Sequence, residues 1–342
     1  FDKGIYEQKI KDYEKAYKTF FELLEFDSAY YPAHREFIKL GVMLKKNDEL
    51  QNFYKKLETK LVADNLTKSA YIYARALLLS YETNLKTNLD IAINLCNNAI
   101  DLNAGEPLIY QLRGWLFFQK ELLIKDANTA ENAIIDYKTA LALIKSDNYQ
   151  SAAELYLNIA NTYFHIKNYF FALKYYSMFY QLFLTHNLRF EKEQLKVFYA
   201  NYAFSNYSEN NYQLAEKYYQ KAIEFANTNA EKQMFYEKLA ILHYANFNYT
   251  TAAAMLEKAA DLNASKNSAA KYFNTRATLL FLINRLTELQ QSNELTELYK
   301  LQLQKKLLDL FDISKKLLTK NYNVIDKSQK GFFDFKINLD EQ

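Results

Sequence analysis

One pattern of large and small residues occurs three times in succession between residues 151 and 263, and it constrains the fold more than any other feature. In each copy, apolar residues at spacings of three and four mark one helix, and a second stripe with the same spacing follows after a short polar break. Each stripe carries an alanine at an equivalent position among large side chains. These alanines form the pairs Ala160 and Ala172, Ala203 and Ala215, and Ala240 and Ala252. The pattern predicts successive helix pairs whose two members approach closely at the alanines.

Weaker copies continue toward the N-terminus with the same order of small and large positions. Gly41 and Gly114 replace the alanine of the first helix in two of these copies. Gly4 replaces it in an incomplete copy whose second helix contains Ala16 and Phe20. We therefore expect the chain to begin inside a repeat, and either to be part of a longer protein or to have lost an N-terminal segment.

This pattern resembles the tetratricopeptide repeat, in which a large residue, a Leu-Gly-like pair and a tyrosine precede an alanine and an aromatic residue. The segment 212–224, YQLAEKYYQKAIE, is very similar to the second helix of that family. The resemblance covers about residues 1–264 and is most specific from residue 151 onward. It implies an all-α fold, a right-handed superhelical solenoid of antiparallel helix pairs, in a protein that we expect to be bacterial.

The repeat pattern is lost after residue 264. Two leucine-rich helices are predicted at Ala269–Gln290 and Asn293–Lys320, so we interpret residues 265–321 as a helical cap over the last repeat. Residues 322–342 form a different, extended tail, in which Phe333, Phe335, Ile337 and Leu339 alternate with polar residues as in a strand. The tail is disordered, pairs with a partner, or docks on a helical surface of this chain, which is the hypothesis we favour.

Two kinds of signal predict helix boundaries within the array. The segment 246–248, in which two asparagines flank Phe247, interrupts two apolar stripes and marks a turn between helices. Ser151 with Glu154, and Thr228 with Glu231, have the spacing of capping boxes, in which a hydroxyl and a carboxylate bind free amides at a helix start.

Composition excludes several classes of function. The 43 basic and 40 acidic residues give a net charge of +3, which favours neither nucleic acid nor an anionic membrane as partner. The longest dense apolar stretch, 277–283, is too short to cross a bilayer, so we expect a soluble chain, in the cytoplasm or in the periplasm and cell envelope. With five scattered glycines, no loop can cradle a phosphate group.

No catalytic or cofactor site is indicated. The four histidines lack the spacing of a metal-binding helix, and His243 lies on a core stripe, where we expect a packed side chain. Cys96, the single cysteine, occupies an apolar repeat position and is interpreted as a small buried residue rather than a nucleophile. We therefore expect a protein that is not an enzyme and that needs no metal or cofactor.

The predicted binding surface is the stripe beside the core stripe on the first helices, which lines the inner face of such a solenoid. Its aromatic residues, with amide side chains beside them, would pack an apolar peptide and bind its backbone; alternatively, they seal the seams between repeats. The stripe carries no Lys or Arg to clamp a terminal carboxylate. The predicted groove residues are Trp115, Phe118, Asn158, Asn161, Phe164, Asn201, Phe204, Tyr207, Glu237, Ile241 and Tyr244, with Gln111 beside them.

These features together indicate a non-catalytic scaffold or adaptor that binds a peptide or helical segment of a partner protein. Two alternatives stay open: a structural subunit of a cell-envelope or secretion assembly, and a regulatory repeat domain of a longer enzyme or sensor. The sequence contains no signal for the oligomeric state.

Overall fold

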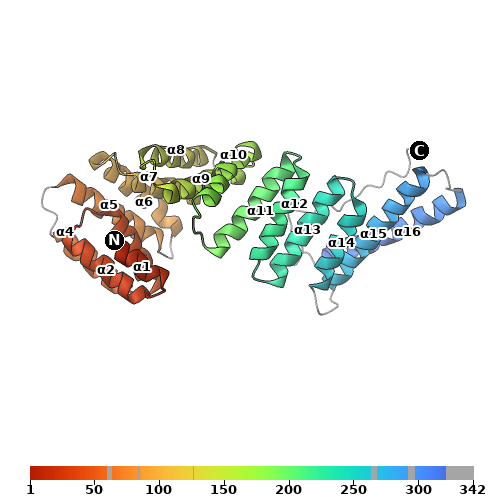
Figure 1. Cartoon of the computed structure of the whole chain (residues 1–342), viewed down its shortest axis with the longest axis horizontal. Coiled ribbons are helices and arrows are strands. Elements are labelled where there is room, and N and C mark those ends of the chain that lie inside the picture. The colour runs from red at the N-terminus through yellow and green to blue at the C-terminus, as the bar shows by residue number, and fades with distance from the viewer. Residues whose placement is uncertain (60–63, 83–84, 126, 263–267, 292–296, 321–342) are drawn as a thin grey trace. The chain divides into compact units, whose positions relative to one another are not determined.

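A computed structural model describes residues 1–59, 64–82, 85–125, 127–262, 268–291 and 297–320 (Figure 1). Within these ranges the chain contains helices and no strand, so the all-α prediction is confirmed there. The predicted extended tail, with Phe333 to Leu339, lies outside the described residues. The helices are α1 Asp2–Lys9, α2 Tyr13–Phe26, α3 Tyr31–Met43, α4 Asn47–Thr59, α5 Asn65–Ser80, α6 Leu85–Leu102, α7 Pro107–Ile124, α8 Ala127–Leu143, α9 Tyr149–His165, α10 Tyr169–Thr185, α11 Lys192–Ser208, α12 Tyr212–Phe225, α13 Asn229–Ala245, α14 Tyr249–Asp261, α15 Ser268–Gln291 and α16 Glu297–Lys320.

The chain divides into two compact units, which we call unit 1 (residues 1–189, with α1 to α10) and unit 2 (residues 190–342, with α11 to α16). In both units each helix packs against the next one along the chain, and from α5 to α12 each odd-numbered helix packs most closely with the even-numbered helix that follows. Outside that range the pattern changes, because α3 packs more on α2 and α5 than on α4, and α15 packs more on α14 than on α16. The helices expected after the repeat array are present as α15 and α16. The repeated pattern continues across residue 189 and does not predict this division.

Small side chains lie where the two helices of a pair touch. All six alanines named above are at most 1% exposed. Gly114 on α7 faces α8, where a Cβ atom would lie 2.9 Å from Cε1 of Tyr137 and 3.1 Å from the carbonyl oxygen of Ala133. A Cβ atom at Gly41 would lie 2.7 Å from the Leu50 side chain. The close approach that the repeated small positions predict is therefore present in both strong and degenerate repeats.

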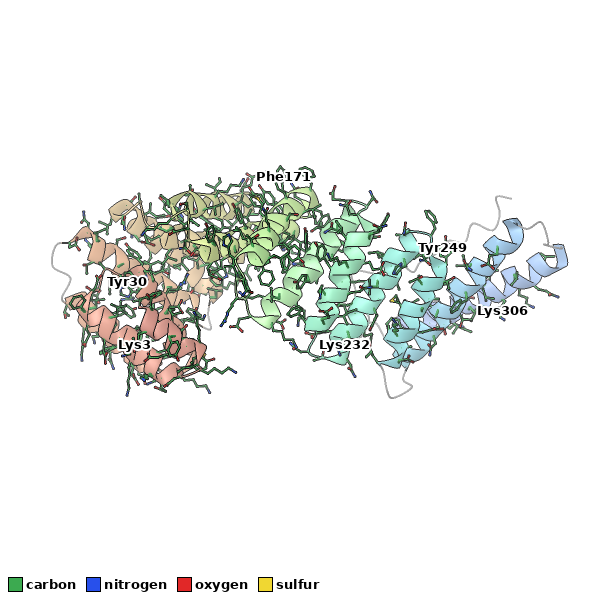
Figure 2. All side chains as sticks on the ribbon, viewed as in Figure 1. Lys3, Tyr30, Phe171, Lys232, Tyr249 and Lys306 are labelled. Atoms are coloured by element: carbon green, nitrogen blue, oxygen red, sulfur yellow. The ribbon has the colours of Figure 1, made fainter. Side chains whose placement is uncertain are left out.

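A recurring tight turn joins the helices of several pairs. After α13, Phe247 adopts a left-handed conformation with φ 58°, and the side chain of Asn248 accepts a hydrogen bond from the Thr251 amide at 3.2 Å as α14 begins at Tyr249 (Figure 2). Lys167 and Asn168 repeat this arrangement between α9 and α10, with φ 61° at Lys167. The predicted turn at 246–248 is confirmed, and its left-handed position is occupied by ordinary side chains rather than glycine.

One of the two predicted capping boxes is confirmed and the other is wrong. Thr228 accepts a hydrogen bond from the Glu231 amide at 3.2 Å, and the Glu231 carboxylate accepts one from the Thr228 amide at 3.3 Å. In contrast, α9 begins before Ser151, because the Asn148 side chain caps it by accepting from the Ser151 amide at 3.2 Å. Glu154 lies inside α9, where Gln150 donates to it at 3.1 Å.

Polar contacts also connect neighbouring helices. In unit 1, the Arg113 guanidinium on α7 donates from Nε and Nη2 to the Asp136 carboxylate on α8, at 2.8 and 2.7 Å. Its Nη1 donates to Asn97 on α6 at 2.7 Å. In unit 2, the buried ammonium of Lys196 on α11 pairs with Glu231 on α13. Because charge-assisted hydrogen bonds need a specific geometry, these contacts help to fix the relative positions of the helices that they join.

Gly114→Ala tests the close approach within a pair. The added methyl group must displace the buried Tyr137 ring or the α8 backbone, so we expect a loss of about 1 to 3 kcal/mol in the free energy of unfolding, despite alanine's better helix propensity. Gly105→Ala is the matched control, because a Cβ atom there meets only a side-chain oxygen at 3.6 Å. Equal melting temperatures for the two variants would contradict the packing described.

Lys167→Gly tests the left-handed turn. A left-handed residue with a side chain costs about 1 to 2 kcal/mol that glycine avoids, and the greater freedom of the unfolded glycine chain offsets part of this gain. We expect the variant to unfold at the same or a higher urea concentration than the natural chain. Lys18→Gly, at an exposed position inside α2, should instead lose about 1 kcal/mol. A similar loss at both positions would rule out the proposed role of the turn.

Candidate functional site

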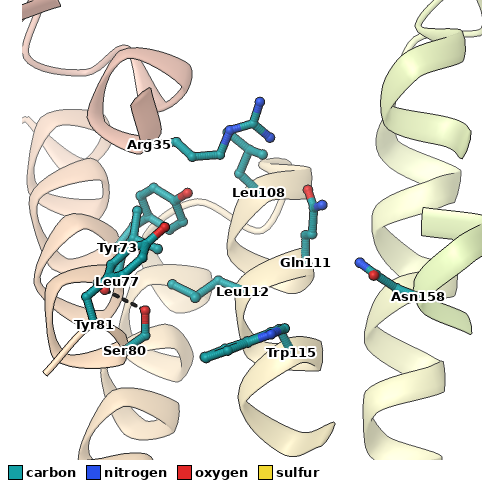
Figure 3. Close-up of a pocket in the computed structure, with 10 residues that line it drawn as sticks. All are labelled: Arg35, Tyr73, Leu77, Ser80, Tyr81, Leu108, Gln111, Leu112, Trp115 and Asn158. Atoms are coloured by element: carbon teal, nitrogen blue, oxygen red, sulfur yellow. Dashed lines mark hydrogen bonds between the residues drawn. The ribbon is translucent and has the colours of Figure 1, made fainter. Parts of the chain in front are cut away.

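Unit 1 contains a pocket of about 350 Å³ that is lined only by first helices of its pairs. Residues of α5 and α7 form most of the wall, Arg35 on α3 closes one end, and Asn158 on α9 faces it across an open side (Figure 3). The volume is at the lower end of the range of small-ligand pockets and suits one large side chain with its backbone. The lining residues are Arg35, Tyr73, Leu77, Ser80, Tyr81, Leu108, Gln111, Leu112, Trp115 and Asn158.

The apolar part of the pocket comes from one face of α7 and one face of α5. Leu108, Leu112 and Trp115 follow one another at helical spacing on α7, so they project from the same side of the helix. Leu77 of α5 lies opposite Leu112 (Figure 3). Trp115 is partly buried against the core of unit 1, so its ring is held by packing. The pocket therefore has a preformed apolar surface.

Arg35 provides the positive charge of the pocket. Its Nε donates to the Glu36 carboxylate at 3.1 Å, and its Nη1 lies 4.0 Å from an oxygen of Glu154 on α9. Burial lowers the pKa of this guanidinium, but the carboxylates of Glu36 and Glu154 outweigh that effect and raise its pKa. With 34% of the side chain still exposed, the charged group remains accessible from the pocket.

Two tyrosines place phenol groups in the same pocket. Tyr73 is only 2% exposed, and its hydroxyl makes no hydrogen bond with the part of the chain that the structure describes. Burial raises the pKa of Tyr73 far above its ordinary value, and burial also raises that of Tyr81. Both phenols are therefore neutral hydrogen-bond donors at neutral pH.

Carboxylates outnumber the single guanidinium at this site. Glu36 is buried beside Arg35, and Gln8 donates to its second oxygen at 3.2 Å. Glu106 caps α7 by accepting from the Leu108 amide at 3.1 Å, and burial raises the pKa of its carboxyl group, while Arg35 lowers it. With Glu154, three carboxylates act on Arg35 or Tyr73, so the region around the pocket is net negative.

Of the residues predicted for the groove in unit 1, some line the pocket and the others contact neighbouring side chains outside it. Trp115 and Asn158 line the pocket together with Gln111. The other three contact side chains of unit 1: Phe118 packs edge-to-face on His165 with ring centroids 5.6 Å apart, Asn161 accepts a hydrogen bond from Tyr176 at 2.7 Å, and Phe164 meets Tyr169 at 5.6 Å.

In unit 2 the predicted stripe mainly contributes to packing. Glu237 and Ile241 are 1% and 5% exposed, and Tyr207 and Tyr244 pack against the core cluster that contains Ile241. The other two stripe residues, Phe204 and Asn201, are half-buried on α11; the Phe204 ring lies 6.0 Å from that of Tyr207, and the Asn201 carbonyl accepts from Ser205 at 2.9 Å. Glu237 and Ile241 are therefore closed to a partner, whereas Asn201, Phe204, Tyr207 and Tyr244 remain partly exposed.

Sequence reasoning missed Arg35, Tyr73 and Tyr81. The predicted groove stripe on the first helices begins at Gln111 and contains no basic residue. The structure places Arg35, from an earlier first helix, on the same surface. A signal was present, because Arg35 precedes Gly41 by the same number of residues as Leu108 precedes Gly114. The degenerate character of the Gly41 repeat concealed this equivalence.

Other chemistry-bearing residues are packed in the interior. Cys96 is fully buried, and burial raises the pKa of its thiol to about 12, as expected for a small apolar residue. His243 is 5% exposed and lies 3.5 Å from Glu216, which confirms a packed side chain. In the described ranges, no three His, Cys, Asp or Glu side chains are grouped to hold a metal ion.

None of the helices in the described part of the chain is both long enough and apolar enough to cross a bilayer.

No family model matches the chain, and no curated protein matches its sequence. Among solved structures, the apo form of the quorum sensor NprR from B. thuringiensis is similar over 97% of this chain and 95% of its own, with 16% identity and a TM-score of 0.50. The chain has the tetratricopeptide-repeat fold.

Two other solved repeat proteins are similar to parts of this tetratricopeptide-repeat chain. The C-terminal part of a TPR repeat-containing protein from Cytophaga hutchinsonii matches 79% of this chain and 98% of its own, at 17% identity and a TM-score of 0.46. YrrB, described as a TPR protein with an unusual peptide-binding site, matches 59% of this chain and 89% of its own, at 16% identity and a TM-score of 0.45.

His34 positions α3, which carries Arg35, and this contact should depend on pH. The buried ring bonds the Ser28 carbonyl and the Tyr54 hydroxyl, each at 2.9 Å, and burial lowers its pKa to about 4. Because the unfolded chain has the higher pKa, near 6.5, the stabilisation is complete above about pH 6.5 and is lost as the pH falls toward 4.

We expect the free energy of unfolding to fall between pH 7 and 4.5 by about 2 to 3 kcal/mol more in the natural chain than in His34→Gln. Urea titrations of both proteins at the two pH values measure this difference, and the titration of shared carboxylates cancels in the comparison. The same pH dependence in both proteins would show that His34 does not titrate as the buried contact requires.

Proposed function

We propose that this chain is a scaffold that binds a segment of a partner protein at the pocket of unit 1. The observation that carries the proposal is that first helices of four successive pairs contribute to one open pocket with both apolar and hydrogen-bonding groups. A surface that spans several repeats suits an extended or helical segment, because such a segment presents side chains at regular intervals along its length.

The chemistry of the pocket supports a peptide segment as ligand. Trp115 and the leucines offer apolar contact, while Gln111 and Asn158 carry amides that can both donate to and accept from a peptide backbone. Aromatic residues in partly preformed pockets dominate the affinity of many protein interfaces. The pocket has no nucleophile beside a base among its lining residues, so binding is the activity that these groups support.

Site-specific crosslinking in the source cell tests the proposal. A photoreactive amino acid is placed at Gln111, inside the pocket, and separately at Ile135, which is 58% exposed on the second helix α8. We expect a discrete adduct with one partner protein from position 111 and none from position 135. Trp115→Ala in the Gln111 variant should reduce that adduct several-fold, while circular dichroism shows retained folding.

The two positions also distinguish the alternatives. A structural subunit that packs through its second helices would crosslink from position 135, with or without Trp115. Absence of an adduct from position 111 in a folded protein would contradict the proposed function.

A further inference from the structure

We propose that the unit 1 pocket takes an uncharged apolar side chain together with a neutral backbone carbonyl of the partner, and that it discriminates against a carboxylate at the same place. This inference rests on the proposed function and specifies the chemistry of the segment that is bound. It follows from three features of the pocket: a phenol hydroxyl that opens into it and is free to donate, a guanidinium already compensated by carboxylates, and a preformed apolar wall.

The first feature is the Tyr73 hydroxyl. The Tyr73 ring is buried, but its hydroxyl is not one of the fully enclosed polar atoms that lack a partner, so it opens into the pocket, where a ligand oxygen can accept its hydrogen bond in place of solvent. Tyr73 lines the pocket, is 2% exposed and finds no acceptor in the described residues. The terminal nitrogens of Arg35 likewise make no hydrogen bond within the described chain, because only Nε bonds Glu36. The site thus presents hydrogen-bond donors that a ligand acceptor can satisfy.

The second feature decides which acceptor fits. Glu36 and Glu154 already neutralise Arg35, and Glu106 adds a further negative charge near Tyr73. A ligand carboxylate would meet three carboxylates and one guanidinium, which is unfavourable in a partly desolvated site. A peptide carbonyl accepts the same hydrogen bonds without adding charge. The electrostatics therefore favour an internal peptide group over a chain terminus or an acidic side chain.

The third feature, the apolar wall, determines which kind of partner side chain can lie beside that carbonyl. Leu77, Leu108, Leu112 and Trp115 give the pocket an apolar wall, and its volume of about 350 Å³ accommodates a leucine or phenylalanine side chain with the adjoining amide. A buried polar side chain would have few partners along this wall. The expected anchor is therefore a large apolar residue within the partner segment.

The chain carries its own reporter for this site, because Trp115 is its only tryptophan. The full chain is titrated with N-acetyl-leucinamide, which ends in a neutral amide, and with N-acetyl-leucine, which ends in a carboxylate, and Trp115 fluorescence is followed at pH 7. Ligand efficiencies of about 0.3 kcal/mol per atom place the expected Kd of the amide in the millimolar range. We expect a saturable change with the amide and binding at least fivefold weaker for the acid.

Matched variants test the donor assignment. Tyr73→Phe removes only the hydroxyl and should weaken amide binding about threefold to tenfold, whereas Tyr6→Phe, on the exposed face of α1, should leave it unchanged. Arg35→Gln should weaken amide binding without making the acid the better ligand. Melting temperatures of all variants are compared first, and if Tyr73→Phe does not fold, the comparison of amide and acid in the natural chain decides.

Three outcomes would overturn the inference: no saturable fluorescence change up to about 50 mM amide, equal or tighter binding of the acid, or unaltered amide binding by folded Tyr73→Phe. Each is separable from the proposed function. A partner crosslink at Gln111 together with any of these results would retain the binding surface and reject only the assigned ligand chemistry.

Discussion

Close contact between the helices of each pair is the interaction on which the rest of this structure depends. At Gly114 and at the alanines of the stronger repeats, one helix lies directly against a large side chain of the next. Such contact buries the aromatic residues of the second helices, Tyr137 and Tyr176 among them, almost completely. Apolar burial of this kind, within each pair and against the adjacent pairs, provides most of the stability of a repeat protein.

Packing within the pairs determines which helix faces remain accessible to a partner. Both helices of a pair contribute large buried residues, such as Leu116 on α7 and Tyr137 on α8, but the first helices of unit 1 also keep one face partly open between repeats. In unit 1 that face carries the pocket, and in unit 2 the corresponding positions Glu237 and Ile241 are covered. Accessibility does not follow the unit alone, because Leu157 in unit 1 is buried while Phe204 in unit 2 is half-buried, so the neighbouring side chains decide whether a position is accessible.

Tertiary contacts at the pocket change which ligand charge Arg35 favours. An arginine on a first helix would by itself suggest a site for anions. Glu36 from the same helix and Glu154 from α9 compensate Arg35, and Glu106 at the start of α7 makes the region net negative. Because the carboxylates come from three helices, only the folded arrangement determines which ligand charge the pocket accepts.

The sequence by itself determined the helix pairs, the turn at 246–248, the capping box at Thr228 and the burial of Cys96 and His243. These features depend on spacing and on local chemistry, which a single chain displays directly. Trp115 and Asn158 were identified on the same basis, but the sequence did not show that they face Arg35 and Tyr73. That grouping needs helices from four pairs to converge on one pocket. The capping of α9 by Asn148, the division after residue 189 and the burial of Glu237 were likewise decided by tertiary packing, because they depend on which surfaces meet.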